Sequence, residues 1–124
     1  MKKVISTPKA PAAIGPYSQA IVSGNFIFTS GQIPINPASG NVEGSTIEEQ
    51  AEQACKNVEA ILKAAGSDIS KVVKTTCFLK NLGDFNAFNA VYEKHFVSKP
   101  ARSCFEVSGL PKGSLVEIET VAEL

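Results

Sequence analysis

The sequence lacks tryptophan, contains a single histidine, and balances 12 basic residues with 12 acidic residues. A net charge of zero gives no electrostatic footprint for nucleic acid, so we expect no nucleic-acid partner. It also removes the charge repulsion that keeps protein molecules apart, which favours self-association. No apolar run approaches the roughly 18 residues of a membrane span, so we expect no membrane partner.

Cysteine is scarce, and Cys55, Cys77 and Cys104 are too far apart in the sequence to form a metal or redox motif. Free thiols suit a reducing compartment. Pro8 and Pro11 interrupt the N-terminal region before the apolar core of a signal peptide can form. Together these features predict a cytoplasmic protein. The chain also lacks a glycine-rich dinucleotide motif, a phosphate loop, metal-ligand spacing and a catalytic-triad pattern, so we expect no metal site.

The chain has 124 residues, of which 44% are hydrophobic and 19% charged, and these values predict one folded domain covering residues 1–124. Turn residues and alternating apolar residues predict strands, and helical spacing of apolar residues predicts two helices. The predicted strands are residues 3–6, 17–22, 26–30 with a continuation at 32–36, 72–80, 102–107 and 115–122, and the predicted helices are residues 46–65 and 85–96.

The first helix has the clearest boundaries. Ser45 or Thr46 can cap it, with Glu48 or Glu49 three residues later to complete a capping box, and Gly66 suits its C-terminal end. Asp84 is predicted to cap the second helix. The resulting order, β-β-β-α-β-α-β-β, predicts an α+β fold with a single mixed β-sheet and two helices packed on one face. The other face must be wet or covered by a partner, which suggests an oligomer interface that also forms a pocket.

Pro100 is followed by a predicted strand in which Arg102, Cys104 and Glu106 share one face. An arginine presents a planar fork that matches the two oxygens of a carboxylate, although most arginines at strand ends are simply solvated. A nearby cation makes a thiol more nucleophilic, yet a lone strand cysteine is more often a buried apolar residue. Because the only histidine, His95, is expected to complement a helix dipole, we propose no covalent thiol mechanism.

Glu117 and Glu119 share one face of the last predicted strand. If that strand pairs with the Arg102 strand across the turn at residues 110–113, one carboxylate can approach the arginine. Two solvent-facing carboxylates are the alternative, especially for Glu119. Ser30 and Gly31 are weaker candidates, since their main feature is a glycine that lets a ligand approach the backbone closely.

Five segments resemble the RidA (YjgF-type) family, in the right order and across nearly the whole chain: APAAIGPYSQA (10–20), TSGQIP (29–34), VKTTCFL (73–79), PARSC (100–104) and VEIE (116–119). The resemblance implies a chorismate-mutase-like fold and a homotrimer with three pockets at the subunit interfaces. It also implies hydrolysis of reactive enamines and imines, such as 2-aminoacrylate, 2-iminobutanoate and 2-iminopropanoate, to 2-keto acids and ammonia without a cofactor.

By the same resemblance, Arg102 is the arginine that binds the substrate carboxylate, Glu117 positions or activates water, and Cys104 lines the pocket. Further residues are implied to shape the pocket, some of them from the neighbouring subunit: Tyr17, Ser30, Gly31 and Asn89. The main alternative is a non-enzymatic module that binds 2-keto acids or other small carboxylates, which also needs Arg102. Glu117 favours the enzyme. Neutral charge and the lack of a basic stripe with stacking aromatics argue against the ribonuclease activity linked to some family members.

Overall fold

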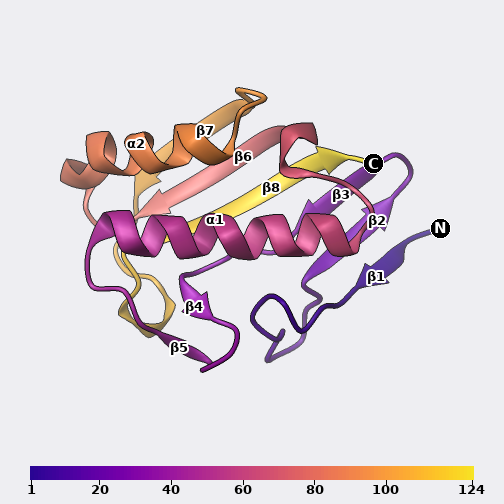
Figure 1. Ribbon diagram of the computed structural model, residues 1–124, viewed down its shortest axis with the longest axis horizontal. Coiled ribbons are helices and arrows are strands. Elements are labelled where there is room, and N and C mark those ends of the chain that lie inside the picture. Colours follow the sequence, from indigo (N-terminus) through magenta and orange to yellow (C-terminus); the bar gives the residue numbers. More distant parts are fainter.

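A mixed β-sheet forms one layer of the structure and two helices form the other (Figure 1). The computed structural model describes residues 1–124. The six-stranded sheet has the order β1-β2-β3-β8-β6-β7. Its strands are β1 (Lys3–Ile5), β2 (Ala20–Ser23), β3 (Phe26–Thr29), β6 (Val72–Leu79), β7 (Ala101–Glu106) and β8 (Val116–Glu123). The helices are α1 (Ile47–Ala64) and α2 (Phe85–His95), and the short strands β4 (Ile35–Asn36) and β5 (Asn41–Val42) form a separate pair.

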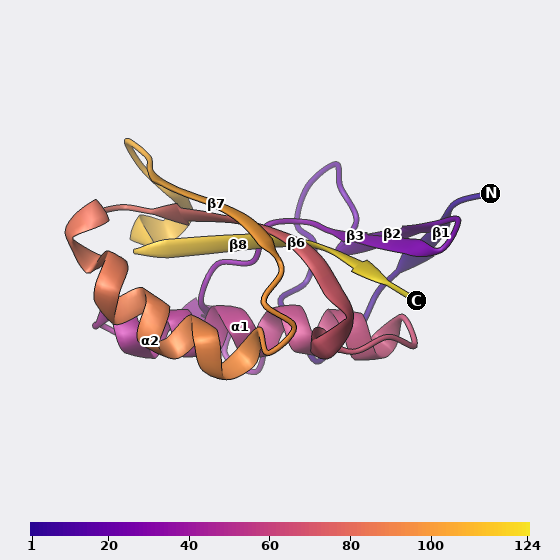
Figure 2. The ribbon, with the colours of Figure 1, turned by 90° about the horizontal axis from the view of Figure 1, so that it is seen from above.

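This architecture confirms the predicted fold class, with both helices on the same side of the sheet (Figure 2). The predicted strand at residues 32–36 is largely wrong. Only β4 and an isolated bridge between Gln32 and Ile118 are found there. The bridge fastens the segment after β3 to β8, and therefore places Gly31 beside Glu117.

The condition under which a carboxylate of the last strand could approach Arg102, a pairing of that strand with the Arg102 strand, is not met. β8 pairs antiparallel with β3 and β6, while β7 pairs only with β6, in parallel. A parallel pair needs a crossover connection, and α2 provides it between β6 and β7. This crossover places β7 at the outer edge of the sheet, so β6 separates Arg102 from the carboxylates of β8.

Local sequence signals explain how α1 is held over the sheet. Thr46 and Glu49 form the predicted capping box, in which each side chain bonds the other residue's backbone N–H at 3.2 Å. Gly66 follows the helix with a φ of +83°, which favours glycine. Asp84 occupies the position before α2 but makes no capping hydrogen bond, contrary to the prediction, because the turn Leu82–Asp84 leads directly into the helix.

The two faces of the sheet differ in composition. On the face covered by the helices, β8 contributes alternate side chains that are almost fully buried: Val116, Ile118, Thr120 and Ala122. The uncovered face exposes large apolar side chains, including Phe28 at 46% and Phe105 at 45%. Neither helix has the length and apolar character that crossing a membrane would require.

Candidate functional site

Arg102 lies on edge strand β7 and points toward α2. Its Nη1 donates a hydrogen bond to Asn89 Oδ1 at 2.7 Å. Its Cζ lies 4.8 Å from the centroid of the Tyr92 ring and 5.4 Å from that of Phe85. Residues 85, 89 and 92 share one helix face because they are four and three positions apart. One face of α2 therefore orients the guanidinium.

The charge of this half-buried arginine has no protein counterpart. No Asp or Glu oxygen lies within 4.0 Å of the guanidinium, and one of its five N–H donors is used by Asn89. A cavity of about 680 Å³ opens beside it, between the end of α2 and the segment that leads to β7. An oriented cation that borders a cavity and lacks an acidic partner is suited to binding an anionic ligand.

The Tyr92 ring packs against the Arg102 guanidinium and is itself fixed by its neighbours. Its hydroxyl shares a buried hydrogen bond of 2.8 Å with Thr75 Oγ1 on β6, and its ring stacks on Phe96 at 4.4 Å. Burial raises the pKa of Tyr92, so the phenol stays neutral. The sequence analysis assigned no site role to Tyr92 or Phe85, since their helical spacing is equally typical of core packing.

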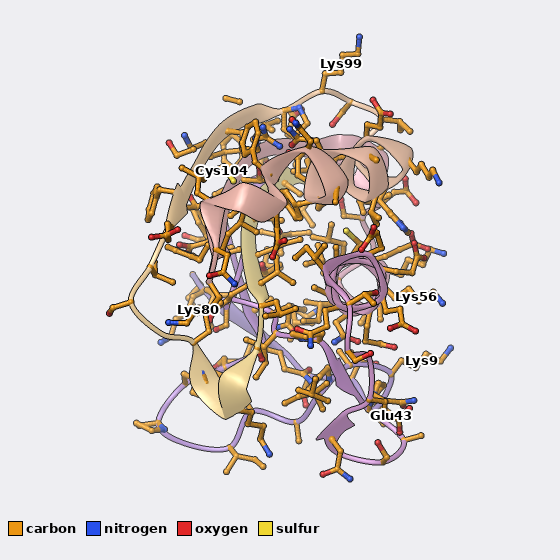
Figure 3. The ribbon with its side chains drawn as sticks, turned by 90° about the vertical axis from the view of Figure 1, so that its left-hand side faces the viewer. Lys9, Glu43, Lys56, Lys80, Lys99 and Cys104 are labelled. Carbon is orange, nitrogen blue, oxygen red and sulfur yellow. The ribbon has the colours of Figure 1, made fainter.

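Cys104 follows Arg102 on the same face of β7, and its register partner across the parallel β6–β7 pair is Cys77. Hydrogen bonding from Cys77, assisted by the charge of Arg102 and opposed by burial, lowers the pKa of Cys104 to about 7. The same hydrogen bond, together with burial, raises the pKa of Cys77. Cys104 lies near the start of α2 (Figure 3). It borders a hollow there of about 470 Å³.

Glu106 shares this face, as predicted, but has a structural partner. Its Oε1 accepts a hydrogen bond from the backbone N–H of Leu82 at 2.8 Å. The carboxylate thus fixes the turn before α2.

Glu117 lies on the opposite face of the sheet from Arg102. Its register partner on β6 is Phe78, which in turn pairs with Phe105 on β7, whereas Arg102 pairs with Thr75. Burial, and then the like charge of Glu119, raises the pKa of Glu117. A carboxyl with this property can exchange protons closer to neutral pH than an ordinary glutamate.

Gly31 makes room for the Glu117 carboxylate. A Cβ added at Gly31 would overlap a carboxylate oxygen and lie 2.8 Å from the carboxylate carbon. The sequence analysis assigned this glycine to close approach of a ligand, whereas in the structure the space over its Cα is occupied by Glu117. Glycine at this position therefore positions the carboxylate.

The loop that carries Tyr17 is fastened to the end of β3. Ser30 Oγ donates to the carbonyl of Ser18 at 2.6 Å, so this predicted pocket residue has a structural hydrogen bond. Tyr17 is 53% exposed and borders, with Gly31, a small hollow of about 60 Å³. Gln19, which the sequence analysis did not single out, is buried, and its carboxamide nitrogen donates to the carbonyls of Thr7, Ala10 and Pro11.

The predicted site residues thus form two separate groups in one chain. The first group, here called the arginine group, contains Arg102, Asn89 and Cys104. The second, here called the glutamate group, contains Glu117 and Gly31, with Tyr17 near Gly31. The two groups cannot meet within one chain, because Arg102 and Glu117 extend from opposite faces of the sheet.

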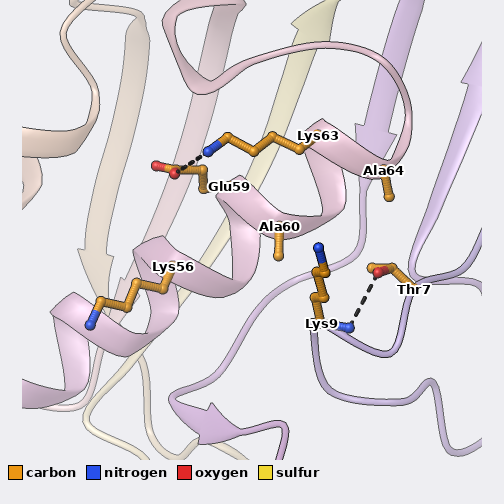
Figure 4. A pocket seen from close by; sticks show the side chains of 7 residues that line it. All are labelled: Thr7, Lys9, Lys56, Glu59, Ala60, Lys63 and Ala64. Atoms are coloured by element: carbon orange, nitrogen blue, oxygen red, sulfur yellow. Dashed lines mark hydrogen bonds and ion pairs between the residues drawn. The ribbon is translucent and has the colours of Figure 1, made fainter.

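Another hollow, of about 440 Å³, lies between α1 and the N-terminal segment (Figure 4). Lys9, Lys56 and Lys63 line it, but their amines point in different directions, and Lys63 pairs with Glu59 at 3.0 Å. None of the predicted site residues borders this hollow.

His95 does not reach the thiols. Its Nε2 bonds Glu52 Oε1 on α1 at 2.8 Å, so it ties the two helices together rather than only complementing a helix dipole. The structure contains no group of three or more His, Cys, Asp or Glu side chains placed to hold a metal ion.

Comparison with known proteins gives concordant matches over the full chain. A family model described as endoribonuclease L-PSP matches residues 7–124. The chain is 51% identical over 123 residues to the human protein named 2-iminobutanoate/2-iminopropanoate deaminase, covering 98% of this chain and 90% of that protein. It is 54% identical over 123 residues to a Lactococcus lactis protein named as a regulator, AldR, covering 98% of each.

The solved structures agree with the sequence matches. The structure of YyfA from Yersinia pestis, described as a member of the Rid protein family, has a TM-score of 0.97, 48% identity and complete coverage of both chains. The resemblance of the five sequence segments is confirmed by these matches, and this chain belongs to the RidA (YjgF/RutC) family.

Proposed function

We propose that this protein hydrolyses small 2-imino acids, including 2-iminobutanoate and 2-iminopropanoate, to 2-keto acids and ammonia. The observation that carries the proposal is Arg102, a half-buried arginine that is oriented by a neutral amide and two aromatic rings and has no acidic partner. Its free N–H donors suit bidentate binding of a substrate carboxylate. The human relative named as a deaminase of these two imines supports the choice of substrate.

The reaction needs only an oriented imine and a water molecule that can lose and return protons. Arg102 holds the carboxylate, which converts a loose encounter into a fixed orientation of the adjacent C=N carbon. As water attacks this carbon, Glu117 accepts a proton from it, and a proton is then delivered to the nitrogen. The resulting intermediate carries a hydroxyl and an amine on the same carbon, and it collapses to the ketone and ammonia.

We further propose that each site forms between two copies of the chain, within a homotrimer. The arginine group of one copy would face the glutamate group of the next. Two features support this arrangement: the two groups lie on opposite faces of the sheet in one chain, and the uncovered face carries exposed phenylalanines. Three free thiols support a reducing compartment such as the cytoplasm as its location.

The test generates the imine in situ. A threonine dehydratase supplies 2-iminobutanoate, and imine decay is followed with wild-type protein, Arg102→Lys, Arg102→Ala and no added protein. We expect wild type to accelerate decay. Arg102→Lys, which keeps the charge but loses the fork, should lower kcat/KM by about 10- to 100-fold, as expected for one lost hydrogen bond to a charged group. Wild-type rates in Arg102→Lys would disprove the role of the fork.

The rival function is carboxylate binding without hydrolysis, and the relative named as a regulator gives it some support. The two functions differ in their need for Glu117, since a carboxylate receptor gains nothing from a second carboxylate. Calorimetry with 2-oxobutanoate on wild type and Glu117→Gln separates them. Tight binding by both proteins, with no acceleration of imine decay by either, would favour the receptor.

A further inference from the structure

Two buried carboxamides on α1 bond the two backbone segments that frame Glu117. Gln50 and Asn57 are 5% and 1% exposed, and they share one face of the helix because they lie about two turns apart. The helix crosses β8 and lies beside β4 (Figure 1). It covers the face of the sheet opposite to the Glu117 side chain, so neither carboxamide can reach the carboxylate directly (Figure 2).

Asn57 holds the chain that follows Gly31. Its Nδ2 donates to the carbonyls of Ile33 at 3.1 Å and Ile35 at 2.9 Å, and its Oδ1 accepts from Gln53 Nε2 at 2.9 Å. The backbone N–H of Ile35 also bonds the Ile33 carbonyl at 2.8 Å, so the chain makes a tight turn whose two carbonyls both accept from the asparagine. Displacing this turn would leave buried polar atoms without partners, which is costly.

Gln50 holds the start of β8. Its Oε1 accepts from the backbone N–H of Leu115 at 2.8 Å, and its Nε2 donates to the carbonyl of Gly44 at 2.9 Å. Leu115 directly precedes β8 and lies two residues before Glu117. One carboxamide therefore joins the segment before α1 to the strand that carries the glutamate.

The two held segments meet at the glutamate group. Gln32 and Ile118 exchange backbone hydrogen bonds of 2.8 and 3.1 Å, and this bridge places Gly31 against the Glu117 carboxylate. Glu117 lies two residues after the held start of β8, and Gly31 lies two residues before the held turn. A shift of either segment therefore changes the space that the carboxylate occupies.

From this geometry we infer that Asn57 and Gln50 are positioning residues for the Glu117 carboxylate, and that they act through the backbone from the opposite face of the sheet. The inference rests on the role of Glu117 in the proposed function and extends it to two residues that touch no substrate. A displaced proton acceptor slows the chemical step but leaves substrate binding by Arg102 intact. Loss of either carboxamide should therefore lower kcat for imine hydrolysis and leave KM nearly unchanged.

Two pairs of variants separate positioning from packing. Asn57→Leu keeps the approximate shape but removes both donors, and it should lower kcat about tenfold, as a small misplacement of a reacting group does. Val58→Ala is its control, because it removes buried packing from the next residue of α1 but no side-chain hydrogen bond, and its kcat should match wild type. Gln50→Glu keeps the acceptor for the Leu115 N–H and should retain most of kcat, whereas Gln50→Met, of similar length, should lose it.

A second measurement needs no catalysis. Hydrogen exchange at the Gln32 and Ile118 amides reports the bridge, and the NMR signal of the Glu117 carboxyl carbon, assigned by its absence in Glu117→Gln, reports the surroundings of the carboxylate. Asn57→Leu should speed exchange at both amides by about tenfold relative to the β6 amides, which report global unfolding, and should move the carboxyl signal. Val58→Ala should leave the relative exchange and the signal close to wild type.

Several results would overturn the inference. They are a wild-type kcat in folded Asn57→Leu or Gln50→Met, an equal loss of kcat in Val58→Ala, and an unmoved carboxyl signal in Asn57→Leu. Failure of the proposed function gives a different pattern. If wild type does not accelerate imine decay but the bridge and the carboxyl signal respond to Asn57→Leu alone, the positioning role stands and the deaminase is rejected. An active wild type whose bridge and carboxyl signal ignore Asn57→Leu gives the reverse.

Discussion

The arginine group and the glutamate group use the two faces of one sheet in different ways. On the covered face, α2 supplies a neutral amide and aromatic rings that orient Arg102 without neutralising it. On the uncovered face, the Glu117 carboxylate occupies the space that a side chain at position 31 would fill, and Glu119 adds a like charge two residues away. Each group therefore keeps one unpaired charge, positive on one face and negative on the other.

The comparison shows why neither group alone forms a site for imine hydrolysis. An anchor without a proton acceptor binds a carboxylate, and a proton acceptor without an anchor has no oriented substrate. Separation also prevents the two charges from pairing within one chain, a pairing that would neutralise both before a substrate arrives. In the proposed assembly, the substrate carboxylate and the attacking water lie between them.

The largest expected effect on activity comes from two variants that each lack one of the groups and are then mixed in one oligomer. Arg102→Ala and Glu117→Gln should each lower imine hydrolysis by about 100-fold or more, because general acid–base catalysis and a charged anchor each contribute at least this much. If the two inactive proteins are unfolded together and refolded, random mixing in a trimer should restore about a quarter of the sites. Activity of the mixture is compared with that of each variant refolded alone.

No recovery of activity in mixed oligomers, verified by mass spectrometry of differently tagged chains, would contradict a site shared between copies. Recovery would show that the arginine group of one chain and the glutamate group of another form one active site.

A smaller effect is expected from Gly31→Ala, which disturbs the glutamate group alone. The added methyl must displace the Glu117 carboxylate, so kcat should fall by about tenfold or more, as a small misplacement of a reacting group does. Binding of 2-oxobutanoate, measured by calorimetry, should change much less because Arg102 is on the other face. Gly109→Ala is the matched control, since nothing lies within 4 Å of its added Cβ. Equal losses in both variants would rule out a positional role for Gly31.

Glu119→Gln tests the electrostatics of the uncovered face. The like charge of Glu119 contributes to the raised pKa of Glu117, so its removal should lower that pKa. Because the carboxylate form is the one that accepts a proton, activity falls as the pH drops through this pKa, and the acidic limb of the pH profile should move to lower pH. A shift of a few tenths of a unit is expected for an exposed pair. An unchanged limb, or a shift to higher pH, would assign it to another group.

The smallest expected effect on activity comes from Thr46→Ala. This change weakens the N-terminal cap of α1, on the helix-covered face of the sheet, and alters no residue of the arginine group or the glutamate group. Loss of the capping box should reduce the free energy of unfolding by about 1 kcal/mol, measured by urea denaturation. At temperatures well below unfolding, kcat and KM should match those of wild type. A large change in KM would mean that the position of α1 influences the arginine group.

Much of the fold follows from local signals in the sequence. The Thr46 cap, the apolar stripe of α1 and the terminating Gly66 are each decided by a few neighbouring residues, and the structure matches them. The pairing of β8 depends instead on which strand the α2 crossover places at the edge. No residue near the turn at 110–113 specifies that choice, so the sequence left open whether Glu117 could approach Arg102.

The site was predictable where the alternation of side chains along a β-strand decides which face of the sheet each side chain points to. Arg102, Cys104 and Glu106 share a face as expected, but the sequence does not show that Glu106 bonds Leu82 or that Cys104 meets Cys77. Those contacts depend on tertiary register. Gly31 is the clearest example, because the sequence indicates an open space over its Cα without showing that a carboxylate from β8 fills it.

The overlap between a Cβ at position 31 and the Glu117 carboxylate gives a criterion for classifying sequences. A chain with any side chain at position 31 cannot keep a glutamate carboxylate at position 117 in this place. Positions 31 and 117 should therefore vary together. A relative that retains the arginine but has lost both the glycine and the glutamate should bind small acids without turning them over. The pair thus separates catalysts from receptors among chains of the same fold, and it does so before any of them is purified.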